Sequence, residues 1–264
     1  MFVSPLPPIP IFPTLRCVAG GVGCLLAIAA PTVAQSSPSP QPLTVEALRV
    51  SSRAYTPPAG SQSSGGASTG GGVRGCGSDM FALAPAFQPP GQTFSEYPTF
   101  MWYLGDGFAD RLEFTLFHQS PAGETEIFSQ AIAVGEAGYQ ALTLPTTAEP
   151  LQVGETYRWQ TTLYCDAEND QAIQWVAAAI TIVEPPRSLA LLETVAPTPW
   201  QKGIRFARAG YWYDALSQVY ATDTVEGQAL RQALLLDIAD LAATADTSAA
   251  NRWSDRLRNL AETP

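Results

Sequence analysis

Alternation of apolar and polar residues with a period of two runs through the middle of the chain and predicts β-strands there. Leu112, Phe114 and Leu116 share one face of such a strand, whereas Glu113 and Thr115 take the other. The predicted strands cover residues 99–103, 112–117, 139–144, 157–165 and 175–183. Because Gly, Pro and acidic turns separate these short strands, the pattern indicates an antiparallel β-sandwich.

The period of the apolar residues becomes helical after residue 198. Helices are predicted within residues 200–220, 228–241 and 251–260, which together form a compact unit of three or four helices. The run Gly210–Leu216 resembles the inter-helix turn of a tetratricopeptide repeat, with an aromatic residue two positions after the glycine and an alanine five positions after it. One such unit is not an array, because stable solenoids need about three or more repeats.

The resulting fold class is mostly β with an all-α C-terminal part. An immunoglobulin- or fibronectin-III-like antiparallel β-sandwich is predicted over residues 73–184, and a small tetratricopeptide-like helical unit over 199–264. Pro185 and Pro186 open the linker between them, residues 185–198.

A structural tyrosine corner is predicted from Leu151, Gly154 and Tyr157, which have the spacing of this motif in immunoglobulin-like sandwiches. In that motif the tyrosine hydroxyl bonds back to the backbone at the entry to the second-last strand. This register places Cys76 just before the first strand and Cys165 at the end of the second-last, at the same end of the sandwich.

The N-terminal segment has the pattern of a secretory signal peptide, residues 1–34. Arg16 precedes an apolar run over residues 17–30, which is short of the roughly 20 residues of a membrane-spanning helix. An uncleaved anchor is the alternative. The Ser-, Pro- and Gly-rich residues 35–72 are predicted to be a disordered linker, because they offer little apolar area to bury.

Removal of the signal peptide takes Cys17 and Cys24 with it and leaves two cysteines, Cys76 and Cys165. In an oxidising compartment these two are expected to form a disulfide, although two free thiols remain the alternative. The bond would close a loop of about 90 residues, worth about 4–5 kcal/mol in the simple chain-entropy treatment.

Charge excludes two classes of partner. The chain has a net charge of −10, and residues 73–184 hold 14 acidic and three basic side chains. Such a surface repels phosphate backbones and anionic membrane surfaces, so nucleic acid is not an expected partner, although solubility is the simpler explanation of the charge. No membrane span is expected after signal cleavage.

No catalytic, metal-binding or cofactor-binding motif stands out. His118 is the chain's one histidine and has no Gly-x-Ser-x-Gly serine to activate, so it is interpreted as a residue at a strand end or turn. The acidic run of residues 166–170, which includes Asp166 and Asp170, lacks the glycine and terminal glutamate of an EF-hand. It is interpreted as a solvated turn, with calcium binding left open.

Aromatic residues suggest two surfaces, each with a structural alternative. Trp102, Tyr103 and Trp175 would form a glycan platform if at least two of them were exposed and coplanar, but tryptophans at strand spacing more often belong to the core. Tyr211 and Tyr213 would form a contact patch on the helical unit, or else pack against the sandwich.

Several of these motifs occur together in one protein family. Arg74–Gly77, Pro98-x-Phe100-x-x-Tyr103, Leu151-x-x-Gly154-x-x-Tyr157-x-Trp159, Cys165-Asp166 and Gly210–Leu216 together resemble an uncharacterised exported cyanobacterial family, domain of unknown function 928. The resemblance implies a periplasmic or cell-surface location and brings no activity, cofactor or catalytic residue with it.

The expected function is that of an exported, non-enzymatic protein-interaction module of the cell envelope, whose partner is another envelope protein. A glycan-binding module is the first alternative. A hydrolase that uses His118 or a carboxyl pair near Asp166 and Asp170 is the second.

Overall fold

The computed structural model describes residues 53–59, 68–70, 79–106, 111–164, 172–188, 191 and 198–262, and these residues form two β-sheets and a C-terminal group of helices. The larger sheet has the strand order β1-β9-β8-β5-β6, and β3 pairs with β9. Its strands are β1 Ser68–Gly70, β3 Gly91–Thr93, β5 Arg111–Ser120, β6 Gly123–Ile132, β8 Thr156–Tyr164 and β9 Ala172–Ile182. The smaller sheet has the order β2-β4-β7, with strands β2 Met80–Ala82, β4 Thr99–Leu104 and β7 Gly138–Thr143.

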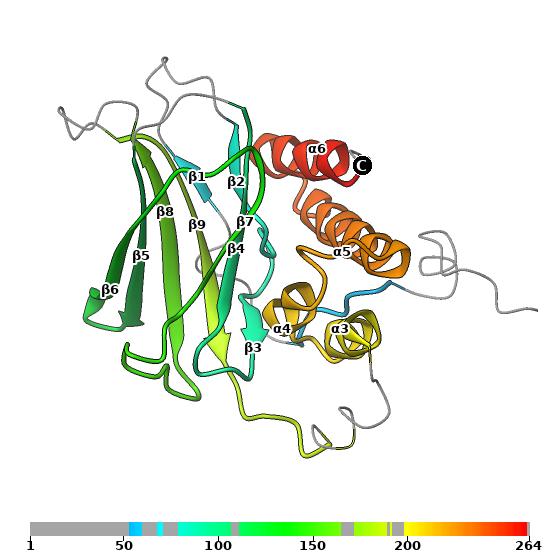
Figure 1. Cartoon of the computed structure of the whole chain (residues 1–264), viewed down its shortest axis with the longest axis horizontal. Helices are drawn as coiled ribbons and strands as arrows, with labels where there is room; N and C mark the ends of the chain where they lie inside the picture. The colour runs from blue at the N-terminus through cyan, green and yellow to red at the C-terminus, as the bar shows by residue number, and fades with distance from the viewer. Residues whose placement is uncertain are drawn as a thin grey trace, which may run out of the picture. The chain divides into compact units, whose positions relative to one another are not determined.

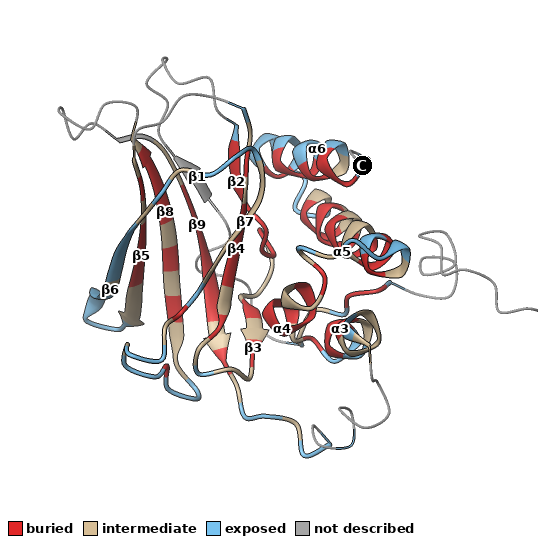
Figure 2. Ribbon diagram, in the orientation of Figure 1, coloured by how far each residue is buried: buried red, intermediate tan, exposed pale blue. Residues whose placement is uncertain are grey.

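The helices lie against the smaller sheet, which therefore stands between them and the larger sheet (Figure 1). They are α3 Pro199–Arg208, α4 Trp212–Ser217, α5 Val225–Ala243 and α6 Ser248–Glu262. Buried residues concentrate on the surfaces where these layers meet, as Figure 2 shows. The coarse prediction of a mostly β protein with a helical C-terminal part is thus confirmed.

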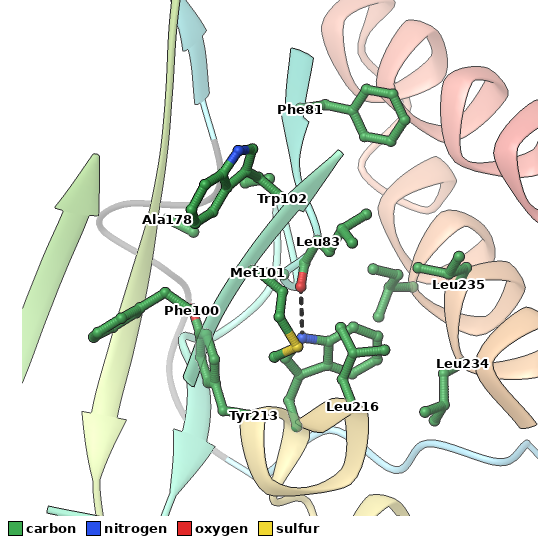
Figure 3. Close-up of a cluster of buried hydrophobic side chains, with 14 of the residues drawn as sticks. Phe81, Leu83, Phe100, Met101, Trp102, Ala178, Tyr213, Leu216, Leu234 and Leu235 are labelled. Atoms are coloured by element: carbon green, nitrogen blue, oxygen red, sulfur yellow. Dashed lines mark hydrogen bonds between the residues drawn. The ribbon is translucent and has the colours of Figure 1, made fainter. Parts of the chain in front are cut away.

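Strand β4 is buried on both of its faces. Phe100 faces the larger sheet, where its ring centroid lies 4.8 Å from that of Phe114 and 5.9 Å from that of Trp159. Met101 points the opposite way, toward Leu216 of α4 (Figure 3). The alternation of a strand sends successive side chains to opposite faces, so a strand with two apolar faces needs a layer on each side.

Five predicted strands are confirmed as β4, β5, β7, β8 and β9, with ends that differ by a few residues. Strand β6 was missed, and so were the three-residue strands β1, β2 and β3. The purely antiparallel arrangement is wrong at one place, because β3 pairs with β9 in parallel. Each missed strand lies at an edge of its sheet or is very short, so none of them shows clean alternation.

The helices and the sheets share one hydrophobic core. The indole N–H of Trp212 in α4 donates to the carbonyl oxygen of Leu83 at 2.9 Å (Figure 3). The guanidinium of Arg231 in α5 lies 4.4 Å from the ring centroid of Tyr139 in β7. Residues 185–198 separate strands from helices along the chain, but the two parts are packed together in space.

The prediction of a disordered linker over residues 35–72 is wrong for residues 53–59. Ala54 and Tyr55 are fully buried. The backbone N–H of Tyr55 donates to a carboxylate oxygen of Asp237 in α5 at 2.8 Å. Its ring meets that of Trp212 edge-on, with centroids 5.0 Å apart. A seven-residue stretch with one aromatic anchor therefore packs on the helices although its surroundings are poor in apolar residues.

Tyr157 makes the type of bond that defines a tyrosine corner. Its hydroxyl accepts the backbone N–H of Gln152 at 3.0 Å, while Leu151 is buried and Gly154 has a φ of +91°. A glycine suits this turn because a positive φ is costly for residues with a Cβ.

Several sequence predictions concern residues outside the described ranges. Cys76, Cys165, the signal peptide over residues 1–34 and the acidic run over 166–170 are among them. Within the described ranges, no helix has both the length and the apolar character needed to cross a membrane.

Candidate functional site

A cleft of about 280 Å³ lies between the segment that joins β3 to β4 and the helices α3 and α4. Residues from three places in the chain line it. They are Thr93, Phe94, Ser95, Tyr97, Pro98 and Thr99 from the first segment, Lys202 and Phe206 from α3, and Tyr213, Asp214, Ser217 and Gln218 from α4. The cleft therefore exists only because the helices pack against the sheets.

Local hydrogen bonds shape the wall formed by residues 93–99. The Thr93 hydroxyl accepts the backbone N–H of Ser95 at 3.0 Å, and the Ser95 hydroxyl accepts that of Tyr97 at 3.2 Å. Such side-chain to backbone bonds compete with a regular strand ladder. The segment consequently turns between β3 and β4 and leaves the hydroxyl groups at the cleft.

Tyr213 fixes the opposite wall to the larger sheet. Its hydroxyl accepts the indole N–H of Trp159 at 2.8 Å and donates to the carbonyl oxygen of Ala179 at 3.0 Å. The close approach of α4 depends on a glycine, because a Cβ built on Gly91 would lie 2.9 Å from the Tyr213 ring. Helix α4 begins just after Gly210, whose φ is +93°.

Asp214 is a buried carboxyl at the base of the cleft, with 8% of its surface exposed. One of its oxygens accepts the Thr93 hydroxyl at 3.0 Å, and the other accepts the backbone N–H of Phe94 at 3.2 Å. Burial raises the pKa of Asp214 to about 7, and these two hydrogen bonds oppose that rise only in part. The carboxyl can therefore exchange a proton near neutral pH.

Lys202 is the only lysine in the chain, since all 13 other cationic side chains are arginines. It is half-buried and lines the cleft from α3. In the described part of the chain its ammonium group makes no ion pair or hydrogen bond. The cleft thus combines one cation, one buried carboxyl, several hydroxyl and amide groups, and aromatic rings.

His118, which was considered for hydrolysis, does not line this cleft, and Asp166 and Asp170 lie outside the described residues. His118 lies near the end of β5, where its Nε2 is 3.0 Å from a carboxylate oxygen of Glu155 and its ring packs beside Tyr157. Among the residues that the structure describes, the cleft is lined by one carboxyl, that of Asp214, whereas glycoside hydrolysis needs two. No cluster of three or more potential metal ligands occurs among the residues that the structure describes.

The aromatic residues are distributed differently from the expected surfaces. Trp102 is buried, and the half-buried Tyr103 stacks on Phe81 with centroids 5.1 Å apart, while Trp175 is half-buried on β9. The contact patch is wrong for Tyr213, which is 1% exposed and packs against the sheet, the alternative left open from the sequence.

Tyr211 is half-buried and meets Phe94 edge-on, with centroids 5.3 Å apart.

Sequence reasoning missed Lys202 and Asp214 as site residues. A usable signal for Lys202 was its status as the single lysine of the chain. Asp214 stood in the sequence between aromatic and apolar residues, which marks a carboxyl that folding buries.

The fold and the cleft define a two-sheet β protein with a C-terminal helical layer and a small, mixed polar and aromatic cleft between them. The chain belongs to the family described as Domain of Unknown Function (DUF928), whose sequence model matches residues 64–248. The match includes every residue that lines the cleft. A comparison with curated proteins found no match.

Proposed function

We propose that the protein is an exported, non-enzymatic protein-interaction module of the cell envelope, located in the periplasm or at the cell surface of a cyanobacterium. The signal-peptide pattern of residues 1–34 supports export. The family resemblance supports the source and the compartment. The immunoglobulin-like character of the sheets is part of the proposal and is supported by the Tyr157 hydrogen bond to Gln152. The tetratricopeptide-like character of α3 and α4 is likewise supported by Gly210 at their junction.

The observation that carries the interaction role is the open edge of the larger sheet. Strand β6 has ten residues, most of them exposed, and pairs on one side with β5. No strand of the described residues pairs with its other side. An unpaired edge presents free N–H and C=O groups, to which an extended segment of a partner can add as a further strand.

The composition of β6 offers little protection against such pairing. Natural edge strands are commonly protected by lysine or proline, and β6 contains neither. Its charges, Glu124 and Glu126, lie near one end. A bulge brings Ile127 out of register, and this apolar side chain is 44% exposed. The contact of the Phe128 ring with Phe114, 6.3 Å between centroids, holds the strand on the core.

The charges along β6 indicate which kind of partner segment would pair with it. Residues 127–132 are uncharged and suit an uncharged extended segment, while Glu126 suits a lysine or arginine on the same segment. Glu124 already binds Arg158 at 2.7 Å and is less available. A second copy of this chain fits less well, because the net charge of −10 makes two copies repel each other.

Site-specific photo-crosslinking in the native envelope tests this proposal. A photoreactive residue at position 127 is expected to yield one discrete adduct with another protein, whereas the same residue at the exposed Val225 of α5 is not. Gln130→Lys should abolish the adduct because it places a charge on the edge, and Gln130→Thr, which keeps the edge uncharged, is the matched control that should retain it. Thermal melts show that both variants fold. Equal labelling at the two positions, no adduct, an adduct with a second copy, or insensitivity to Gln130→Lys would each overturn the proposal.

A further inference from the structure

The cleft contains a cation whose charge is not used within the described part of the chain. Lys202 belongs to a helix that also carries Arg205 and Arg208 and contains no acidic residue. This concentration of positive charge is unusual in a chain with a net charge of −10. The net negative charge of the protein repels anions at long range. The positive charges of α3 beside the cleft can therefore attract an anionic group only at short range, within the cleft.

Asp214 does not serve as the counter-ion of Lys202. Its two oxygens accept the Thr93 hydroxyl and the Phe94 N–H, and no ion pair among the described residues joins it to Lys202. The raised pKa of the carboxyl agrees with this, because an ammonium group in contact would lower it. Lys202 is therefore available to a ligand.

The remaining lining suits a ligand rich in hydroxyl groups. The Ser217 hydroxyl donates to the backbone oxygen of Asp214 at 2.8 Å and accepts the Gln218 side-chain amide at 3.4 Å, which leaves one lone pair of its oxygen for a further bond. Gln218 adds an amide beside α4, and Ser95 adds a hydroxyl on the opposite wall formed by residues 93–99. The half-buried rings of Phe94 and Tyr97 offer apolar surface for the C–H face of a sugar ring.

Size and charge narrow the choice of ligand. The volume of about 280 Å³ is at the lower limit of small-molecule sites, which span about 300–1,000 Å³, so the cleft suits about one ring. A phosphate group is generally held by several backbone N–H groups or several cations, and the described residues that line the cleft include one cation. We infer that this cleft binds a carboxylate-bearing sugar unit, a uronic acid, with its carboxylate on Lys202 and its hydroxyl groups on the polar side chains of the two walls.

The single lysine supplies a specific probe for this inference. Full-length protein labelled with [13C]lysine gives one side-chain Cε resonance, that of Lys202. Titration with glucuronate or galacturonate is expected to shift this resonance to saturation, whereas glucose, which lacks the carboxylate, and acetate, which lacks the ring, should not at the same concentration. No shift with either uronate, an equal shift with glucose or acetate, or an equal shift with inorganic phosphate would overturn the inference.

Calorimetry on variants provides the second measurement. Lys202→Gln is expected to weaken uronate binding by about tenfold or more, because it removes a charge-assisted hydrogen bond. Lys202→Arg, which keeps the charge, should retain part of the affinity. Arg205→Gln is the matched control on the same helix, since Arg205 does not line the cleft, and it should bind as the parent does. Unchanged affinity in Lys202→Gln, or an equal loss in Arg205→Gln, contradicts the assignment.

Discussion

Replacement of Asp214 by asparagine should change how the stability of the protein depends on pH. The carboxyl is buried, and burial raises its pKa from 3.8 to about 7. Asparagine is neutral at every pH and nearly isosteric. Its oxygen can accept the Phe94 N–H while its amide donates to the Thr93 hydroxyl, so both contacts of the parent side chain are kept.

The magnitude follows from proton linkage. Between pH 3.8 and about 7 the folded protein keeps a proton on Asp214 that the unfolded chain has lost. The free energy of unfolding therefore falls by about 1.4 kcal/mol for each pH unit as the pH rises through this window. The total loss by the upper end is about 4 kcal/mol, and Asp214→Asn does not suffer it.

Urea unfolding of the parent and Asp214→Asn at pH 5, 6, 7 and 8 measures this effect. The difference in the free energy of unfolding between the two proteins should move in favour of the variant by about 3 kcal/mol from pH 5 to pH 8, mostly below pH 7. Asp223→Asn is the control, because Asp223 is exposed and makes no ion pair among the described residues, so the difference from the parent should stay constant. Parallel curves for the parent and Asp214→Asn would refute the argument.

Three further predictions concern the hydrophobic core and the predicted disulfide. Tyr55→Phe should leave the melting temperature nearly unchanged, because the buried hydroxyl has no hydrogen-bond partner in the described part of the chain. Tyr55→Ala should lower the free energy of unfolding in urea by about 3–5 kcal/mol. Equal effects of the two substitutions would contradict the packing described for residues 53–59. Gly91→Ala should lower the free energy of unfolding by about 1–3 kcal/mol, because the new Cβ meets a Tyr213 ring that hydrogen bonds hold in place. An unchanged midpoint of urea unfolding would show instead that α4 can move. Cys165→Ala should lower the melting temperature by removing the predicted bond to Cys76, an effect that reduction of the parent should reproduce.

Strands with one apolar and one polar face could be predicted from the sequence. Arg158 and Gln160 stand on the outer face of β8 while Trp159 lies in the core, as the alternation requires. Strand β6 escaped prediction because it is an edge strand that is exposed on both faces, so its sequence shows no period. Tyr55 escaped for a different reason, since its anchor points lie more than 150 residues away in α4 and α5.

The sequence by itself determined the order of the protein's parts, a β-rich part followed by helices, and the family to which the chain belongs. The strands and helices are local features, since the period that predicts each of them depends on residues a few positions apart. Only the tertiary structure decided that Tyr213 is core, that Asp214 is buried and that Lys202 faces the same cleft. The physical reason is that burial and charge pairing depend on segments far apart along the chain, and the cleft forms where residues 93–99 meet helices more than 100 residues later.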